Sequence, residues 1–302
     1  MPGTTNFPSA PFSAEAYKLA EGPLWDAARQ RLFWVDIDTG RVLSAAWAST
    51  GVRSDFEAKV DTTVGAAVLG RAGRLIVAGE HNVFLVDHEG ARTTIVSLLS
   101  PDSRRRLNDA ACDPAGRLLV GSMSLAGAVG QDELFRVDLD GSVEVLDSGL
   151  TLSNGLGWSP SRDLLYNVDS HAGLIWRRRY DAVSGWTGQR EEFARVTDGS
   201  PDGLCVDTSG TVWVSVWGAG EVRGFTSSGH HVATVTVAAP HATSAAFAGP
   251  GLDRMVVTTA RDDLTPEQLR SYPDSGRLFI ASPGAVGQPP NYWGGQAPVA
   301  HR

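Results

Sequence analysis

The sequence predicts an all-β fold, a six-bladed β-propeller, because one pattern repeats through most of its 302 residues. A strand-like run of apolar residues recurs six times, each time directly after a turn rich in Asp, Gly, Pro or Ser. The starts of these runs are separated by 43, 43, 46, 48 and 43 residues, which is the spacing of four-stranded propeller blades. The runs begin at Arg31, Arg74, Arg117, Asp163, Thr211 and Arg254.

The residues around each run fit four strands per unit. Turns such as Asp-Pro-Ala-Gly at 113–116 join antiparallel strands, because their residues favour turn geometry. An alternating segment follows, as at 133–138, and then a short β-prone stretch, as at 143–146. The one short helix that the sequence predicts is 265–270, with Thr265 as its N-cap and Pro266 at the first helical position.

We expect a single domain over 1–302, with its core at about 15–281 and no internal boundary. The ring has to close, and segment 15–20 is expected to complete the last blade beside 277–280. Residues 282–302, with several Pro, Gly and Gln, predict a loosely packed coil tail.

Composition narrows the classes of function. The net charge is −8, from 34 acidic and 26 basic residues, which argues against a nucleic-acid partner. Two cysteines favour a reducing compartment, and both are expected to be buried, unreactive thiols. The sequence shows neither a signal peptide nor 18 consecutive apolar residues, so we expect a cytoplasmic protein with no membrane partner. No protein partner is implied.

One position, nine or ten residues before each run, carries the polar residues of interest. In two units it holds Val64 and Ser244. If the units are blades, the equal distance of these six positions from their runs places them at the same end of the strands that line a central channel. The four remaining residues, Glu21, Asn108, Asn154 and Asp202, would then converge around one mouth of that channel.

Two carboxylates and two amides facing one another supply oxygen ligands for a divalent cation. Without a cation, Glu21 and Asp202 would repel one another, so we expect one divalent cation at the centre of the propeller. Calcium is the first choice on ligand type, while magnesium, manganese, zinc and iron(II) remain candidates. The alternative is that Asn-Gly and Asp-Gly are ordinary turn formers, but turn chemistry gives no reason for Glu21.

Several motifs carry a resemblance to a known family. They are Glu-Gly-Pro-Leu-Trp at 21–25, Arg-Leu-Asn-Asp at 106–109, Ser-Asn-Gly-Leu at 153–156, Pro-Asp-Gly-Leu at 201–204 and Thr-Thr-Ala-Arg at 258–261. In this order they resemble the SMP-30/gluconolactonase/regucalcin family, over roughly 15–281. The resemblance implies a six-bladed propeller that binds a single divalent cation and hydrolyses sugar lactones.

Carried over by position, the resemblance makes Glu21, Asn154 and Asp202 the metal ligands. It makes Arg106 and Asn108 the residues that contact the substrate.

The sequence departs from the family pattern at one place. Members commonly carry an acidic residue, which contacts a sugar hydroxyl, shortly after a Gly-Ser/Thr-Met turn. Here the turn at 121–123 is followed by Ser-Leu-Ala-Gly, with no carboxylate around Ala126. Gln131, Asp132 and Glu133 are the candidates to replace it, and the sugar preference is open.

The leading hypothesis is therefore a metal-dependent aldonolactonase, which opens an aldono-1,4- or 1,5-lactone to the aldonic acid. Gluconolactone, xylonolactone and arabinonolactone are all admissible substrates. Asp202 is assigned a second role as the general base that takes a proton from the attacking water. The competing interpretation is that the cation alone activates the water, and Asp109 is the next candidate for the base.

Two other functions stay open. A hydrolase of other esters or organophosphates would use a more apolar pocket with a histidine base. His241, three residues before Ser244, is the only histidine close in sequence to one of the six channel positions. A non-catalytic, regucalcin-like calcium-binding protein would need the three ligands but not Arg106 and Asn108.

Overall fold

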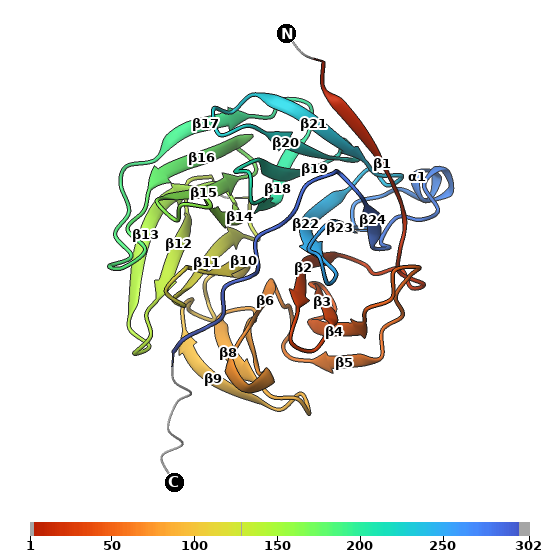
Figure 1. Ribbon diagram of the computed structural model, residues 1–302. Coiled ribbons are helices and arrows are strands. Elements are labelled where there is room, and N and C mark those ends of the chain that lie inside the picture. Colours follow the sequence, from red (N-terminus) through yellow and green to blue (C-terminus); the bar gives the residue numbers. More distant parts are fainter. Residues whose placement is uncertain (1–2, 128, 296–302) are drawn as a thin grey trace.

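The computed structural model describes residues 3–127 and 129–295, and it is an all-β propeller (Figure 1). Sheets radiate from a central axis, and strands follow one another from the axis outward.

Four of the sheets have four antiparallel strands each. The first two comprise β2 (Ala20–Asp26), β3 (Arg31–Asp36), β4 (Arg41–Ala46) and β5 (Phe56–Lys59), then β6 (Ala66–Leu69), β7 (Leu75–Ala78), β8 (Asn82–Val86) and β9 (Arg92–Ser97). The next two comprise β10 (Arg105–Cys112), β11 (Leu118–Ser124), β12 (Asp132–Val137) and β13 (Val143–Leu150), then β14 (Ser153–Trp158), β15 (Leu164–Asp169), β16 (Leu174–Arg179) and β17 (Glu191–Arg195).

The fifth sheet has eight strands, in the order β18-β19-β20-β21-β1-β24-β23-β22. The N-terminal strand β1 joins its two halves, since it pairs in parallel with β21 and antiparallel with β24. The strands are β1 (Thr5–Pro11), β18 (Ser200–Val206), β19 (Val212–Trp217), β20 (Glu221–Phe225), β21 (His231–Thr236), β22 (Ala242–Ala248), β23 (Arg254–Thr259) and β24 (Phe279–Ala281).

The prediction that segment 15–20 closes the ring is wrong in its residues. The strand beside β24 is β1, in which Pro11 pairs with Phe279, so the folded core begins before residue 15. Most of segment 15–20 is a loop, which bridges to Ala260 at Leu19 and donates from Tyr17 N to Gly276 O at 2.8 Å. Pro8 and Pro11 give β1 a weak strand signal, because proline has no backbone N–H to donate to a neighbouring strand.

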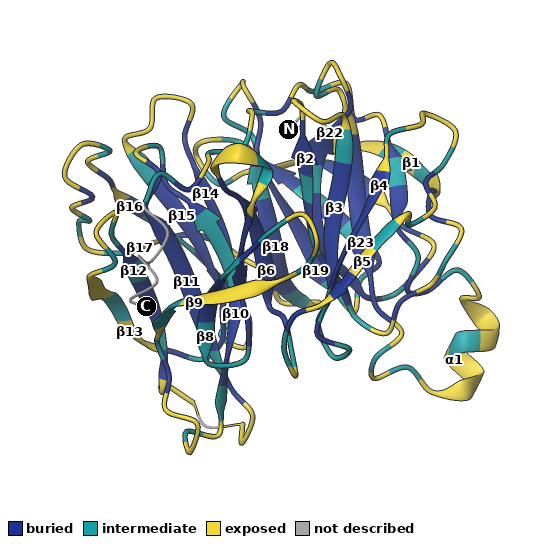
Figure 2. Ribbon diagram, turned by 90° about the horizontal axis from the view of Figure 1, so that it is seen from below, coloured by how far each residue is buried: buried dark blue, intermediate teal, exposed yellow. Residues whose placement is uncertain are grey.

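The strands β2, β6, β10, β14, β18 and β22 contact one another in a closed ring around the channel. Glycines allow this close approach. A Cβ atom on Gly65 would lie 2.2 Å from the Asn108 carbonyl oxygen, and one on Gly155 would lie 2.5 Å from that of Asp202. Figure 2 shows the central strands buried and the connecting turns exposed.

The hydrophobic core lies between neighbouring sheets. One cluster combines Val35 and Val42 of the first sheet with Leu69 and Val77 of the second. The predicted helix is confirmed as α1 (Pro266–Ser271), which Thr265 caps in a capping box with Gln268. A 3-10 turn at Arg71–Gly73 completes the helical segments of the described ranges. Within these ranges no helix has the length and apolar character to cross a membrane.

The C-terminal segment 282–295 is a coil, but it is well packed rather than loose. It crosses the propeller axis (Figure 1), and Trp293 is 3% exposed. Its backbone N–H groups bond to residues far away in the sequence: Trp293 N to Leu69 O at the end of β6, at 2.8 Å, and Gly287 N to Leu252 O in a turn, at 2.8 Å. The rest of the predicted tail, 296–302, lies outside the described residues.

Candidate functional site

The strands that carry polar residues at the site are irregular at those residues. Strand β6, which follows Val64 and has no polar residue at this level, pairs with β7 without a break in register. A β-bulge adds a residue to one strand and re-aims side chains. The breaks fall between Glu21 and Leu24, Leu107 and Ala110, Asn154 and Leu156, Pro201 and Leu204, and Ala242 and Ser244.

Arg106 and Asn108 form one half of the site. Both side chains are buried, and the Arg106 guanidinium donates to Asn108 Oδ1 at 2.7 Å and to Leu107 O at 2.9 Å. Asn108 Nδ2 donates to Ser153 O at 3.1 Å, which ties β10 to β14. The structure therefore brings this predicted substrate-binding pair together directly beside Asn154.

Asn154 and Asp202 form the other half, on β14 and β18. Asn154 Nδ2 donates to Asp202 Oδ1 and, at 3.2 Å, to Ser170 Oγ. Its Oδ1 accepts from Gly155 N at 3.1 Å. Two of the three predicted ligands are thus in direct contact.

Glu21, the third predicted ligand, is close enough to Asp202 for their charges to interact. Burial and then the charges of Asp202 and Asp109 raise the pKa of Glu21 well above its usual range. Burial and Asp109 do the same to the pKa of Asp202. The Arg106 charge opposes both shifts, and burial lowers the pKa of Arg106 itself. The site therefore holds three acidic side chains, two buried and one half-buried, beside one guanidinium, and without a further cation their ionised forms are disfavoured.

These residues fit a hard divalent cation. Their donors are two buried carboxylates and one amide oxygen, from three different strands. Within 3–127 and 129–295 no group of three His, Cys, Asp or Glu side chains is placed to hold a metal, so the third donor would be the amide of Asn154. A flip of the Asn154 side-chain amide, which exchanges the positions of Oδ1 and Nδ2, would present Oδ1 to the cation.

Asp109, in the bulge of β10, lies on the channel side of the site. Its Oδ1 accepts from Ala110 N at 2.7 Å, and burial raises the pKa of its carboxyl to about 6. It faces a cavity of about 460 Å³ that continues along the channel. Asp109 is therefore close enough for its charge to act on Glu21 and Asp202, and within the described residues it forms no hydrogen bond with a predicted ligand.

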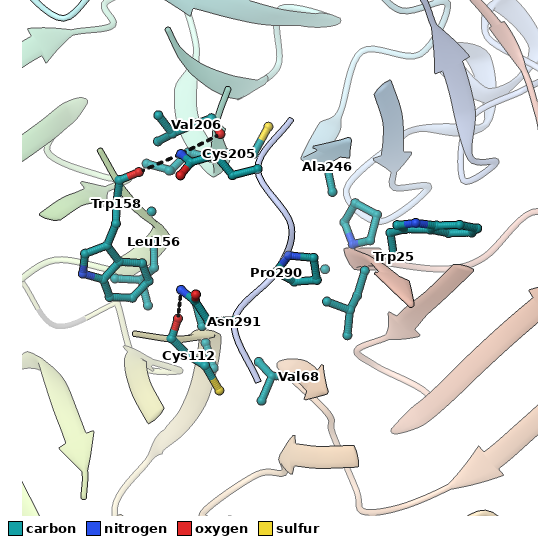
Figure 3. A pocket seen from close by; sticks show the side chains of 18 of the residues that line it. Trp25, Val68, Cys112, Leu156, Trp158, Cys205, Val206, Ala246, Pro290 and Asn291 are labelled. Atoms are coloured by element: carbon teal, nitrogen blue, oxygen red, sulfur yellow. Dashed lines mark hydrogen bonds between the residues drawn. The ribbon is translucent and has the colours of Figure 1, made fainter. Parts of the chain in front are cut away.

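Residues 288–292 of the C-terminal segment line this cavity (Figure 3). They lie at the end of the channel that is farther from the proposed site. Asn291 Nδ2 donates to Cys112 O at 3.0 Å, and Gln288 bonds to the backbone of Trp158 at 3.1 Å. Both cysteines, Cys112 and Cys205, line the cavity, and burial raises the pKa of each thiol. Cys112 is buried as expected, whereas Cys205 is half-buried; a raised pKa disfavours the reactive thiolate of both.

His241 stacks on Trp217, with ring centroids 3.9 Å apart and planes inclined by 14°. Its Nδ1 hydrogen-bonds Asp262 O at 3.0 Å, and burial lowers the pKa of the ring. These contacts give His241 a packing role between β19 and β22.

Two of the three candidates to replace the missing acidic residue, Asp132 and Glu133, are engaged inside their own sheet. Asp132 is fully buried and accepts from Ser124 N at 3.0 Å, and Glu133 pairs with Arg105 at 2.8 Å. Gln131 is exposed.

Sequence reasoning missed a charged pair at the mouth, in which Lys18 Nζ lies 2.6 Å from Asp38 Oδ2. Its only sequence signal is Asp-Thr-Gly at 38–40, which is typical of any turn.

Known proteins resemble this chain in sequence and in fold. Residues 19–261 match the family model described as the SMP-30/Gluconolactonase/LRE-like region. The chain is 35% identical over 279 residues to the pentonolactonase XacC of Haloferax volcanii, covering 90% of this chain and 93% of that protein. It is 30% identical over 292 residues to regucalcin of Xenopus laevis, covering 93% and 97%. The crystal structure of regucalcin from Agrobacterium tumefaciens, described as a calcium-binding protein, superimposes with a TM-score of 0.90 at 26% identity, covering 96% and 99%.

Proposed function

The chain belongs to the SMP-30/gluconolactonase/LRE-like family, and from this premise we propose that it is a divalent-metal-dependent hydrolase of sugar lactones. The observation that carries the proposal is the buried pair of carboxylates, Glu21 and Asp202, beside Asn154 and within electrostatic reach of Arg106. A relative named as a pentonolactonase, matched over nearly its whole length, supports lactones as the substrate class.

The architecture that we assign to this enzyme is a six-bladed propeller forming one domain. Four blades are the four-stranded sheets, and the eight-stranded sheet counts as two more, β18–β21 and β22–β24 with β1. The ring of inner strands supports this count, because it contains one strand from each blade.

Glu21, Asn154 and Asp202 would hold one divalent cation, with calcium as the first choice and magnesium, manganese, zinc and iron(II) as alternatives. A solved relative described as calcium-binding supports that order. When bound, the cation would supply a Lewis acid for the lactone carbonyl group.

The chain's own residues divide the remaining work. The Arg106 guanidinium and the Asn108 amide would orient the substrate, since both are held rigidly by their mutual hydrogen bond. Asp202 would accept a proton from the water that attacks the carbonyl carbon, and return it to the ring oxygen as the C–O bond breaks. The product is the open-chain aldonic acid, with no other co-reactant.

A non-catalytic calcium-binding role is the second candidate, because relatives named regucalcin match almost the entire chain. Such a protein needs the three ligands. It does not need a buried, desolvated arginine beside them, and Arg106 therefore favours the enzyme.

Removing the metal tests the proposal. Glucono-, xylono- and arabinonolactone are incubated with the purified protein before chelation, after chelation, and after calcium or another divalent cation is restored. We expect hydrolysis that is lost on chelation and recovered with the metal. Calcium binding without turnover of any lactone would favour the second candidate, and hydrolysis that survives chelation would refute metal dependence.

A further inference from the structure

A small charged group sits at the channel mouth, next to the proposed site but separate from it. Lys18 Nζ lies 2.6 Å from Asp38 Oδ2 and 3.7 Å from Asp262 Oδ1. The three side chains are 56%, 28% and 33% exposed, so solvent and small molecules reach them. They come from the loop before β2, the turn after β3 and the loop after β23.

Strand register places Asp38 at the mouth end of the site. Ala20 pairs with Asp36 and Glu21 with Val35, and Ile37 N bonds to Leu19 O at 3.0 Å. The chain beyond Asp36 therefore continues past Glu21, and Asp38 lies outside it on the solvent side. Arg106 precedes Asn108 by two residues, at the mouth end of β10.

The charge of Asp38 acts on the Arg106 guanidinium. Burial lowers the pKa of Arg106, and four carboxylates oppose this through their charge, Asp38 first and then Glu21, Asp202 and Asp132. Glu21 and Asp202 belong to the proposed metal site.

The other two carboxylates differ in access. Asp132 is fully buried and accepts hydrogen bonds from Ser122 and Ser124. Asp38 is the accessible one, and its only ion pair in the described part of the chain is with Lys18, not with Arg106. Asp38 and Arg106 therefore lie at the same mouth of the channel, and a polar molecule that enters there passes the exposed Asp38 carboxylate.

We propose that Asp38 and Lys18 bind hydroxyl groups of the substrate opposite Arg106, and that they determine the preference for polyhydroxylated lactones. A sugar hydroxyl can donate to the Asp38 carboxylate and accept from the Lys18 ammonium group. A site that hydrogen-bonds hydroxyls discriminates strongly against ligands without them. This inference rests on the proposed lactonase activity and names the residues that select its substrate.

Substrates with and without hydroxyls separate this role from catalysis. Asp38→Asn and Lys18→Met are compared with wild type on glucono-1,5-lactone, xylono-1,4-lactone and γ-butyrolactone, which has no hydroxyl group. We expect KM for the two sugar lactones to rise about tenfold or more, with kcat within about twofold. Kinetics on γ-butyrolactone should not change. Asp140→Asn is the matched control, since Asp140 lies on an exposed turn and bonds only to Ser142 there.

Unchanged KM for both sugar lactones in Asp38→Asn would overturn the inference, and so would an equal loss on γ-butyrolactone. If the wild-type protein hydrolyses no lactone, the proposed function fails, and a binding measurement then decides the inference separately. Methyl β-D-xylopyranoside has hydroxyls but no lactone carbonyl. Calorimetry in a calcium-containing buffer should show that it binds the Asp38→Asn protein more weakly than the wild-type protein. Equal binding, or no binding to either protein, would overturn it.

Discussion

Asp202 is the residue on which the proposed chemistry converges. It contacts Asn154, and it shares the buried negative charge of the site with Glu21. A bound cation would hold its carboxylate ionised at neutral pH, in which state it can accept a proton. Its roles as ligand and as base are therefore separable only by a substitution that keeps a ligating oxygen.

Asp202→Asn is that substitution. We expect the variant to keep the fold and some metal, and to lose about 10²–10⁴-fold in kcat, the usual contribution of a general base. Steady-state kinetics on metal-replete protein, with metal content measured by elemental analysis, provide the check. Near-normal turnover would show that the proton goes elsewhere, and Asp109→Asn would then be the next variant to test.

At the scale of the strand, bulges and glycines build the site together. The bulges turn polar side chains toward the channel, and the glycines let neighbouring inner strands come close enough for those side chains to meet. Gly155 shows both effects, because it lies inside the β14 bulge and against the backbone of β18.

Gly155→Ala should therefore disturb the site through the backbone. Its Cβ would meet Asp202 O at 2.5 Å and Leu204 N at 3.0 Å, neither of which is a flexible side-chain atom. We expect a loss of about 1–3 kcal/mol in the free energy of unfolding, measured by urea denaturation, and weaker metal binding. The control is Gly251→Ala, whose Cβ would approach only the Asp253 side chain, at 3.3 Å. Equal stability of the two variants would contradict this account of the inner strands.

At the scale of the whole molecule, the two ends of the chain hold the ring together. Strand β1 joins the halves of the eight-stranded sheet at the outside. Segment 282–295 crosses the axis at the end opposite the site, and bonds to turns of several sheets. In the proposed enzyme, the substrate would enter through the opposite mouth, which carries Arg106 and Asp38.

Trp293→Ala tests the contribution of the C-terminal segment. Removing this buried side chain should cost about 3–5 kcal/mol in the free energy of unfolding, because it leaves a cavity against the second and third sheets. Trp186→Ala, at a tryptophan that is 60% exposed, should change stability by no more than about 0.5 kcal/mol. Thermal and urea unfolding of both variants provide the measurement. Equal losses in the free energy of unfolding for Trp293→Ala and Trp186→Ala would show that the C-terminal segment does not stabilise the propeller.

The sequence by itself determined the repeat and the level at which the polar residues lie. Apolar periodicity and turn residues are local signals, so the strand runs and the short helix capped by Thr265 were predictable. Their equal spacing from the strand runs predicts that Glu21, Asn154 and Asp202 lie at the same end of their strands, as they do in β2, β14 and β18.

Only the tertiary structure decided the contacts between segments far apart in the chain. The pairing of β1 with β24, the packing of Trp293 and the ion pair of Lys18 with Asp38 join residues whose own sequences carry weak or ordinary signals. The bulges belong here too, because a break in register is a property of two strands rather than of one. Long-range pairing depends on the complementarity of surfaces that exist only once the sheets have formed, and no local pattern encodes it.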